Sequence, residues 1–293
     1  SIEKHPFQRD ALCALHQRYA EFATLAGQLR EAWPPLVAGL HRLQFEDDRL
    51  TLTLAFGDAL ELMPDLRLAA DAIYLDGFAP RCNPEMWSAQ LMRGLARLAR
   101  PGTTVATYSS AGAVREGLEA AGFTLEKYPG FGRKRDMLRG SFAPRWPPRR
   151  ARAAPPDRTD RHAMVIGAGL AGAAISERLA ARGWKIDLIE RRALPALQVP
   201  ARYAGVFHPH ISRDDCILSR ATRSGFLYAV SRWLALERAG QTLAWVRCGV
   251  LQLAADSERG QRMIEAIAAL GYPPDYAQYL ERIRSLPDSG GER

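Results

Sequence analysis

The chain has 293 residues, 47% of them hydrophobic and 25% charged, with a formal net charge of +8 at pH 7. These values are typical of a globular protein with room for two domains. Apolar runs stay shorter than the roughly 18 residues that a bilayer-spanning helix needs. We therefore expect a cytoplasmic protein with no signal peptide and no membrane partner.

Cysteine and histidine usage bears on metal and disulfide chemistry. The four cysteines lie far apart and form no Cys-x-x-Cys pair; they are Cys13, Cys82, Cys216 and Cys248. This spacing fits a reducing compartment and predicts neither a disulfide framework nor a zinc site. His208-Pro-His210 has no acid or cysteine cluster at ligand spacing beside it, so we predict no metal there.

The first half of the chain alternates between predicted helices and strands. In chain order they are a strand end at 1–4, a helix at 5–30, strands at 50–56 and 71–78, a helix at 86–98, a strand at 103–108, a helix at 111–121 that Gly122 caps, and strands at 123–128 and 137–142. The last two strands are predicted to pair antiparallel. The pattern predicts an α/β domain, Rossmann-like, with a doubly wound parallel sheet.

Three acids stand at the predicted carboxyl ends of strands, where such a sheet binds its ligands. They are Glu3, Asp58 and Asp76. Each alone is more often a turn or capping residue. Together they favour a nucleoside pocket with carboxylates for ribose hydroxyls and a reacting amine. The closing strand pair is typical of S-adenosylmethionine-dependent methyltransferases, and a dehydrogenase-type Rossmann domain is the competing interpretation.

A dinucleotide-binding pattern lies in the middle of the chain. Residues 162–166 predict a buried strand, followed by Gly167, Gly169 and Gly172 in Gly-x-Gly-x-x-Gly order and then a helix. These glycines permit a tight turn, close approach of a pyrophosphate and close helix–strand packing. A second strand ends at Glu190, 23 residues after Gly167, where a ribose-binding acid is expected. The alternative is a glycine-rich helix start without a ligand.

Nearly all of the excess positive charge lies between residues 133 and 161, which contain ten Lys or Arg and three Asp. Such a block fits either a solvated linker or contact with a polyanion, RNA or DNA. Its Pro-rich part, 144–161, predicts an extended linker between domains at 1–143 and 162–293. Further on, the aromatic and apolar positions of 226–236 share one helical face and predict core packing.

Three segments of the sequence are long and particular enough to point to one protein family. They are Leu75-Asp-Gly-Phe-Ala-Pro-Arg-Cys-Asn-Pro-Glu-Met-Trp87, Arg97-Leu-Ala-Arg-Pro-Gly102 and Gly130-Phe-Gly-Arg-Lys-Arg-Asp-Met137. With the glycine pattern that follows them, they resemble the family of bifunctional tRNA 5-methylaminomethyl-2-thiouridine biosynthesis proteins, from residue 1 to about residue 286. In that family a methyltransferase domain precedes an FAD-dependent oxidoreductase domain of the amino-acid oxidase type.

The resemblance implies a two-step modification of the wobble uridine in the tRNA anticodon loop. FAD-dependent oxidation removes the carboxymethyl group from 5-carboxymethylaminomethyl-(2-thio)uridine, and methylation by S-adenosyl-L-methionine follows. It implies Asp76 as the catalytic group at the amine. The expected ligand-binding residues are Glu3, Asp58 and Ala59 for S-adenosyl-L-methionine; Gly167, Gly169, Gly172 and Glu190 for FAD; and Phe78, Asn83, Trp87, Arg133, Lys134 and Arg135 for the tRNA.

The resemblance also has departures. We expect the family's glycine-rich methionine-cofactor loop to lie before Glu3 and the flavin domain to continue beyond residue 293, so that the chain is an internal fragment, and we expect a monomer. Bulky residues at 199–203 replace a small-residue stretch beside the flavin. Two alternatives stay open: an FAD-dependent amine or amino-acid oxidase with a nonenzymatic RNA-binding domain upstream, and an inactive fragment.

Overall fold

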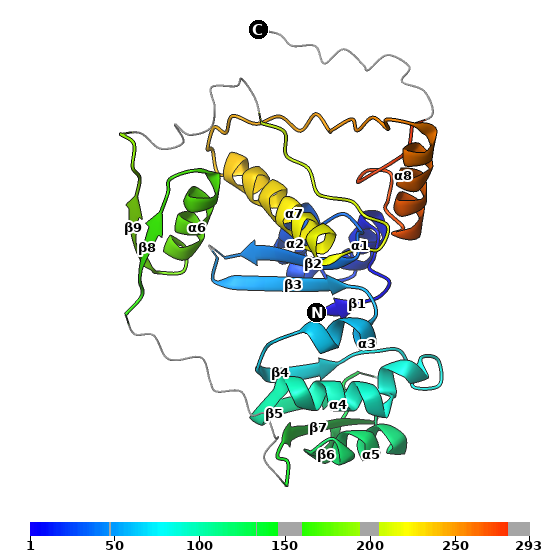
Figure 1. Ribbon diagram of the computed structural model, residues 1–293. Coiled ribbons are helices and arrows are strands. Elements are labelled where there is room, and N and C mark those ends of the chain that lie inside the picture. The colour runs from blue at the N-terminus through cyan, green and yellow to red at the C-terminus, as the bar shows by residue number, and fades with distance from the viewer. Residues whose placement is uncertain (47, 133, 146–159, 194–204, 281–293) are drawn as a thin grey trace. The chain divides into compact units, whose positions relative to one another are not determined.

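The computed structural model describes residues 1–46, 48–132, 134–145, 160–193 and 205–280. It divides into two compact units (Figure 1). The first unit contains Ser1–Phe56 and Asp160–Arg293, and the second contains Gly57–Thr159. This division does not follow the expected domain boundaries, so the domains at 1–143 and 162–293 stay a prediction. Most of the expected linker, and the 199–203 stretch, lie outside the described residues.

The first unit begins with a three-stranded sheet in the order β1-β3-β2. Its strands are β1 (Ile2–Glu3), β2 (Gly39–Phe45) and β3 (Leu50–Phe56). β1 runs parallel to β3, and β2 pairs antiparallel with β3 along its whole length. β3 has the predicted bounds, whereas β2 was not predicted. The pattern that could have predicted β2 is an alternation of buried and exposed positions, in which His41 and Leu43 are buried between more exposed neighbours.

The single helix expected over residues 5–30 is wrong. The segment forms α1 (Arg9–His16) and α2 (Ala23–Ala32), with a 3₁₀ turn between them. The helix is interrupted at Tyr19, whose backbone is not helical (φ −130°, ψ 70°). Reversing the chain lets the two helices pack together, and Arg30 donates a hydrogen bond to Cys13 Sγ at 3.3 Å. It also lets Leu29 pack against the buried core of the β2–β3 hairpin.

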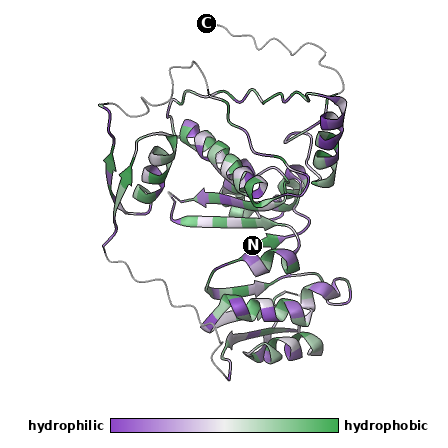
Figure 2. Ribbon diagram, viewed as in Figure 1, coloured by the Kyte–Doolittle hydropathy of each residue, from purple (hydrophilic) through white to green (hydrophobic). Residues whose placement is uncertain are grey.

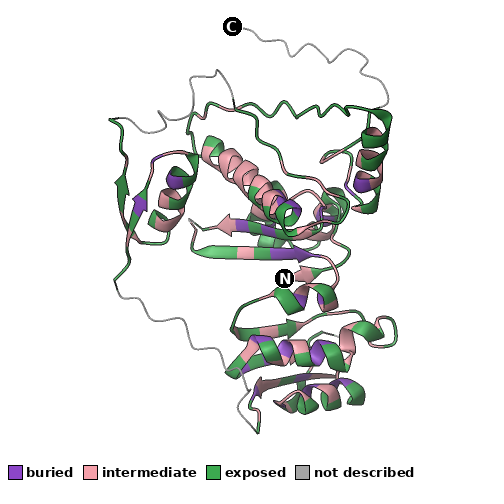
Figure 3. Ribbon diagram, in the orientation of Figure 1, coloured by how far each residue is buried: buried purple, intermediate pink, exposed green. Residues whose placement is uncertain are grey.

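The second part of the first unit contains the predicted strand–helix–strand motif. β8 (His162–Ile166) and β9 (Lys185–Ile189) pair parallel, and α6 (Leu170–Ala180) connects them. The expectation that the first strand is buried is wrong. Only Val165 of β8 is buried, and Ile166 is 83% exposed. In Figure 3 the ribbon of β9 is mostly in the colour of exposed residues. A two-stranded sheet with one covering helix buries few of its residues.

Two further helices complete the first unit: α7 (Ile217–Arg238) and α8 (Ser257–Ala269). α7 packs against β2. The helix predicted at 226–236 is confirmed, and Phe226 and Trp233 contact the ring of Phe207 with centroids 5.0 and 5.3 Å apart. The expected core packing is not seen, because residues 226–236 are half-buried and none is fully buried. Arg223 on the same helix is 2% exposed and donates to both carboxylate oxygens of Asp215.

The second unit is a four-stranded sheet in the order β4-β5-β7-β6 with helices. Its elements are α3 (Ala59–Leu62), β4 (Ala70–Leu75), α4 (Ala89–Leu98), β5 (Ala99–Thr107), α5 (Gly112–Ala120), β6 (Phe123–Pro129) and β7 (Asp136–Phe142). α4 alternates apolar and polar residues along its length (Figure 2). Its apolar side and that of α5 bury Met92 and Leu118 fully. The predicted antiparallel pairing of β6 with β7 is confirmed.

The α/β class is confirmed, but residues 1–142 form two described sheets where one doubly wound sheet was expected. Within these two sheets, parallel pairing joins β1 to β3 and β4 to β5, and the other pairs are antiparallel. β4 is an edge strand without a buried residue, so the expectation that Asp76 follows a buried strand is wrong. An open groove of about 470 Å³ is lined in part by Tyr74, which is 81% exposed.

Candidate functional site

The glycine turn between β8 and α6 has the geometry of a dinucleotide site. Gly167 adopts φ +96° and donates its N–H to Ile189 O at 2.7 Å, which fixes the turn to the end of β9. A Cβ at Gly172 would lie 1.8 Å from Gly167 O, so only glycine fits there. A Cβ at Gly169 would meet nothing within 4 Å. The turn is therefore closed on the protein side and open on the side where a ligand approaches.

Glu190 follows β9 and closes the same turn. Its carboxylate accepts the N–H of Ala168 at 2.8 Å and that of Arg192 at 3.1 Å. These hydrogen bonds, that from Ala168 first, hold the pKa of Glu190 below its ordinary value, so it is ionised near neutral pH. Each carboxylate oxygen keeps acceptor capacity for a ribose hydroxyl. α6 begins without a side-chain cap, which leaves its first N–H groups available to an anion. With the open space beside Gly169, the four predicted residues fit a dinucleotide.

Asp76 lies in the second unit, in the loop directly after β4. Its side chain is exposed, and two aromatic residues from elsewhere in the chain hold the loop that carries it. Tyr108 donates its hydroxyl to Gly77 O at 2.7 Å, and Trp87 donates Nε1 to Phe78 O at 2.8 Å. The rings of Trp87 and Tyr108 meet edge to face with centroids 6.4 Å apart. The sequence placed Asp76, Phe78 and Trp87 in one site, and the structure brings them together.

Tyr108 is the residue of this site that the sequence analysis missed. It follows the last residue of β5, where a parallel strand ends, and that position is the only signal that could have pointed to it. Burial, and then the nearby Asp76 and Cys82, raise the pKa of Tyr108 above its ordinary value of 10.0. The phenol therefore stays protonated near neutral pH and keeps donating to Gly77 O.

The loop between β6 and β7 reaches the same place. Lys134 Nζ lies 4.9 Å from the centroid of the Tyr108 ring, a cation–π distance. Arg135 points into solvent with 95% of its side chain exposed. Arg133, predicted to act with them, lies outside the described residues. Of the predicted cations, the structure brings Lys134 to the Asp76 site, whereas the side chain of Arg135 contacts its neighbour Asp136.

The remaining predicted residues show structural roles. Asp58 caps α3 by accepting the N–H of Leu60 at 2.8 Å, and Ala59 begins that helix as a buried residue. Glu3 belongs to the first unit and accepts the N–H of His5 at 2.8 Å. Asn83 precedes a 3₁₀ turn at Pro84–Trp87. Capping is the structural role that such acids most often have. Binding of a methyl donor by these residues stays a prediction.

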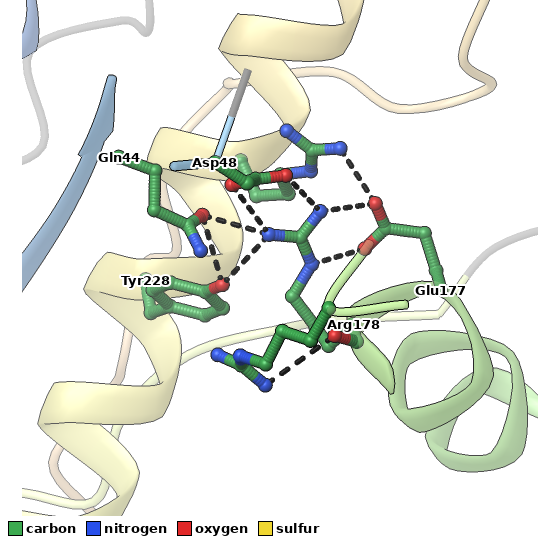
Figure 4. A network of polar contacts seen from close by, with 7 residues as sticks. Gln44, Asp48, Glu177, Arg178 and Tyr228 are labelled. Atoms are coloured by element: carbon green, nitrogen blue, oxygen red, sulfur yellow. Dashed lines mark hydrogen bonds and ion pairs between the residues drawn. The ribbon is translucent and has the colours of Figure 1, made fainter. Parts of the chain in front are cut away.

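A half-buried polar cluster in the first unit was not predicted from the sequence. Arg178 of α6 is 11% exposed in its side chain and donates to Gln44 of β2 at 2.8 Å and to both oxygens of Asp48 at 3.1 and 3.2 Å (Figure 4). Glu177 and Tyr228 complete its contacts. The cluster joins the helix of the glycine turn to β2, the turn after it and α7.

Other features bear on metals and membranes. Within the described ranges, no group of three or more His, Cys, Asp or Glu is arranged to hold a metal ion. His208 Nδ1 lies 3.0 Å from Pro209 O, and His210 donates its N–H to Thr222. None of the described helices combines the length and apolarity needed to cross a membrane.

The two halves of the chain match two enzyme families. Residues 20–143 match the S-adenosyl-L-methionine-dependent methyltransferase family, and residues 162–289 match the FAD dependent oxidoreductase family. These matches agree with the order predicted from the sequence and with the glycine turn of β8 and α6. The chain therefore combines a methyltransferase-type region with a flavoenzyme-type region.

Named relatives match nearly the whole of this chain. The chain is 49% identical over 290 residues to the tRNA 5-methylaminomethyl-2-thiouridine biosynthesis bifunctional protein MnmC of Ralstonia nicotianae, and 52% identical over 301 residues to that of Paraburkholderia phytofirmans. Each alignment covers 99% of this chain but only 44% and 46% of the relative, so the chain spans about half their length. The predicted resemblance to this family is confirmed. A solved structure titled MNMC2 from Aquifex aeolicus matches 36% of this chain and 35% of that chain at 30% identity, with a TM-score of 0.32, too low to establish a shared fold.

Proposed function

We propose that the protein modifies the wobble uridine of tRNA in two steps. FAD-dependent oxidation removes the carboxymethyl group from 5-carboxymethylaminomethyl-(2-thio)uridine, and methylation by S-adenosyl-L-methionine then converts the aminomethyl group to methylaminomethyl. The observation that carries this proposal is about 50% identity over 99% of the chain to proteins named for this biosynthesis. The glycine turn supports the oxidative half, and the Asp76 site supports the methylating half.

In the oxidative half, the chain's own residues bind and orient. Bound FAD would supply the hydride acceptor for oxidation of the substrate's C–N bond. The N–H groups at the start of α6 would hold the pyrophosphate, and Gly169 leaves room for it. The ionised carboxylate of Glu190 would accept hydrogen bonds from the ribose.

In the methylating half, the amine must be neutral to act as a nucleophile. We assign to Asp76 the role of orienting the aminomethyl nitrogen and accepting or relaying its proton. Its exposed position after β4 leaves it accessible to a substrate, and the Tyr108 and Trp87 hydrogen bonds fix the backbone beside it. Fixed geometry matters here because a small displacement of a catalytic group lowers the rate steeply.

We assign the tRNA contact to the loop after β6 and to the loop after β4. Lys134 and Arg135, with Arg133, would contact phosphates of the anticodon loop, and Phe78, Asn83 and Trp87 would line the substrate site. We expect these cations to matter more than the Pro-rich linker. A cytoplasmic monomer remains part of the proposal.

Product analysis tests the function. The protein as its gene encodes it is incubated with FAD and tRNA that carries 5-carboxymethylaminomethyl-2-thiouridine, with and without S-adenosyl-L-methionine, and the nucleosides are quantified by mass spectrometry. We expect aminomethyl product without the methyl donor and methylaminomethyl product with it. Product that stops at aminomethyl in both reactions favours an amine oxidase with a nonenzymatic RNA-binding domain. Unchanged substrate in both indicates an inactive chain.

A further inference from the structure

Phe131 stands at the tip of the hairpin that joins β6 to β7. At 94% exposure it is more exposed than any other large hydrophobic residue that the structure describes. Exposed apolar side chains are common on surfaces when they are isolated. This one lies on the same loop as Lys134, whose Nζ contacts the ring of Tyr108 in the Asp76 site.

The loop is built to hold Phe131 outward. Gly130 donates its N–H to Arg135 O at 3.0 Å, and Lys134 donates its N–H to Phe131 O at 3.2 Å, which closes a tight turn. A Cβ at Gly130 would lie 2.3 Å from Lys134 O, and Gly132 adopts φ +63°. The turn therefore requires glycine at both positions. Because Phe131 lies between them, the turn holds it at the tip of the hairpin.

The surroundings combine aromatic faces with cations. On the same hairpin, the Arg139 guanidinium lies 3.6 Å from the centroid of the Tyr128 ring. Arg135 is solvent-exposed, and Phe78, on the loop that Trp87 holds, is 76% exposed. Tyr74 is also exposed, but it lies on a β-strand and lines an open groove, whereas Phe131 lies at the tip of a hairpin.

This combination fits an unpaired nucleobase better than a lipid or an apolar protein surface. Single-stranded RNA is bound by aromatic rings on which bases stack and by cations that follow the phosphates. We propose that Phe131 is a stacking platform for an unpaired base of an RNA loop, with Lys134 and Arg135 contacting the adjoining phosphates. The proposal rests on the proposed function, because the RNA that would be presented to Asp76 is the tRNA substrate.

Salt dependence separates stacking from charge. Binding of a fluorescein-labelled RNA stem-loop with an anticodon-like loop is measured over a range of salt concentrations for Phe131→Ala, Phe131→Trp and a Lys134→Ala/Arg135→Ala double variant. Phe131→Ala should weaken binding by roughly 5- to 150-fold at every salt concentration and leave the log–log slope unchanged. Phe131→Trp should retain affinity. The double variant should reduce the slope by about 1.4, at roughly 0.7 per single-strand phosphate contact.

A matched control and an altered RNA complete the test. Phe22→Ala removes another exposed aromatic side chain, in the first unit, and should leave binding unchanged. When the stacked base is replaced by an abasic site, the effect of Phe131→Ala should disappear. Two results would overturn the stacking role and leave the proposed function standing. One is equal affinity of wild type and Phe131→Ala. The other is a loss of affinity in Phe131→Ala that also changes the log–log salt slope. Failure of the wild type to bind the stem-loop overturns both.

Discussion

The glycine turn and the Asp76 loop are two candidate sites that the chain builds in different ways. Every part of the glycine turn lies between β8 and Glu190, and backbone geometry alone requires glycine at positions 167 and 172. The Asp76 loop depends on Trp87, on Tyr108 and on the hairpin that carries Lys134. A site formed by one short segment can be predicted from the sequence. For a site assembled from separate loops, the sequence predicts only some of the residues.

The two sites should also respond differently to substitution. In the glycine turn an added methyl group at Gly172 would collide with backbone that cannot move aside. The hydrogen bonds around the Asp76 loop each contribute only about 0.5–1.5 kcal/mol. Changes in the turn should therefore damage the fold, and changes in the loop should mainly damage the chemistry.

The largest effect is expected at Asp76. Asp76→Asn keeps the shape of the side chain but removes the proton acceptor, so methyl transfer should slow by roughly 10²- to 10⁴-fold while flavin-dependent oxidation continues. The measurement is the ratio of aminomethyl to methylaminomethyl product. Asp71→Asn, at an exposed position on β4 paired with Arg100, is the control and should leave the ratio unchanged. Methylation of Asp76→Asn at the wild-type rate would remove Asp76 from the site.

The next largest effect separates fold from binding within the glycine turn. Gly172→Ala should lower the free energy of unfolding by about 3 kcal/mol or more, because its Cβ would meet Gly167 O. Gly169→Ala has open space around its Cβ, so stability should change little while FAD affinity falls. Thermal unfolding without FAD and titration with FAD give the two readouts. Equal losses of stability in both variants would show that the turn is not closed by Gly172.

The same distinction between local and assembled structure decides how much the sequence predicts. The strand 50–56, the β6–β7 pair and the strand–turn–helix motif of Gly167 follow from short-range patterns, and the structure confirms them. Tyr108 and Arg178 carry no local signal, because their roles depend on partners distant in sequence. The helix expected at 5–30 fails for the related reason that packing of Leu29 on the β2–β3 hairpin favours a break over continuous helical hydrogen bonding.

Arg178 lies on the same helix as Gly172, but its role depends on partners that are distant in sequence. Arg178→Met keeps much of the side-chain volume but removes the donor that both oxygens of Asp48 share, in a half-buried place. Gln44 keeps its hydrogen bond from the Tyr228 hydroxyl. Stability should fall by about 1–3 kcal/mol, the cost of unsatisfied buried polar groups. Hydrogen exchange should show the loss in β2 as well as in α6. Arg182→Met, just beyond α6 on an exposed residue, is the matched control. Loss confined to α6 would mean that the cluster does not join the two elements.

The smallest expected effect is a pH dependence of this same cluster. Burial alone would raise the pKa of Glu177, but hydrogen bonds from Arg178 and Arg232 outweigh it and hold the pKa below the ordinary 4.5. A carboxyl with a lowered folded-state pKa contributes stability above its unfolded value, and this contribution is lost as pH falls through the folded value. The free energy of unfolding should therefore decline below about pH 4.5, and protonation of Glu177 should account for part of this decline.

Glu177→Gln isolates that part. The variant should be less stable than wild type at pH 7, and the difference should shrink on acidification, because protonation removes the same negative charge from wild type. Glu119→Gln is the control: its partner Arg115 is a single exposed neighbour one helical turn away, and such pairs contribute little. Thermal midpoints from pH 7 down to pH 3 provide the comparison. A constant difference between wild type and Glu177→Gln would mean that Glu177 acts through its shape and hydrogen-bond geometry. A shrinking difference would identify its charge as the link between the helix of the glycine turn and its neighbours.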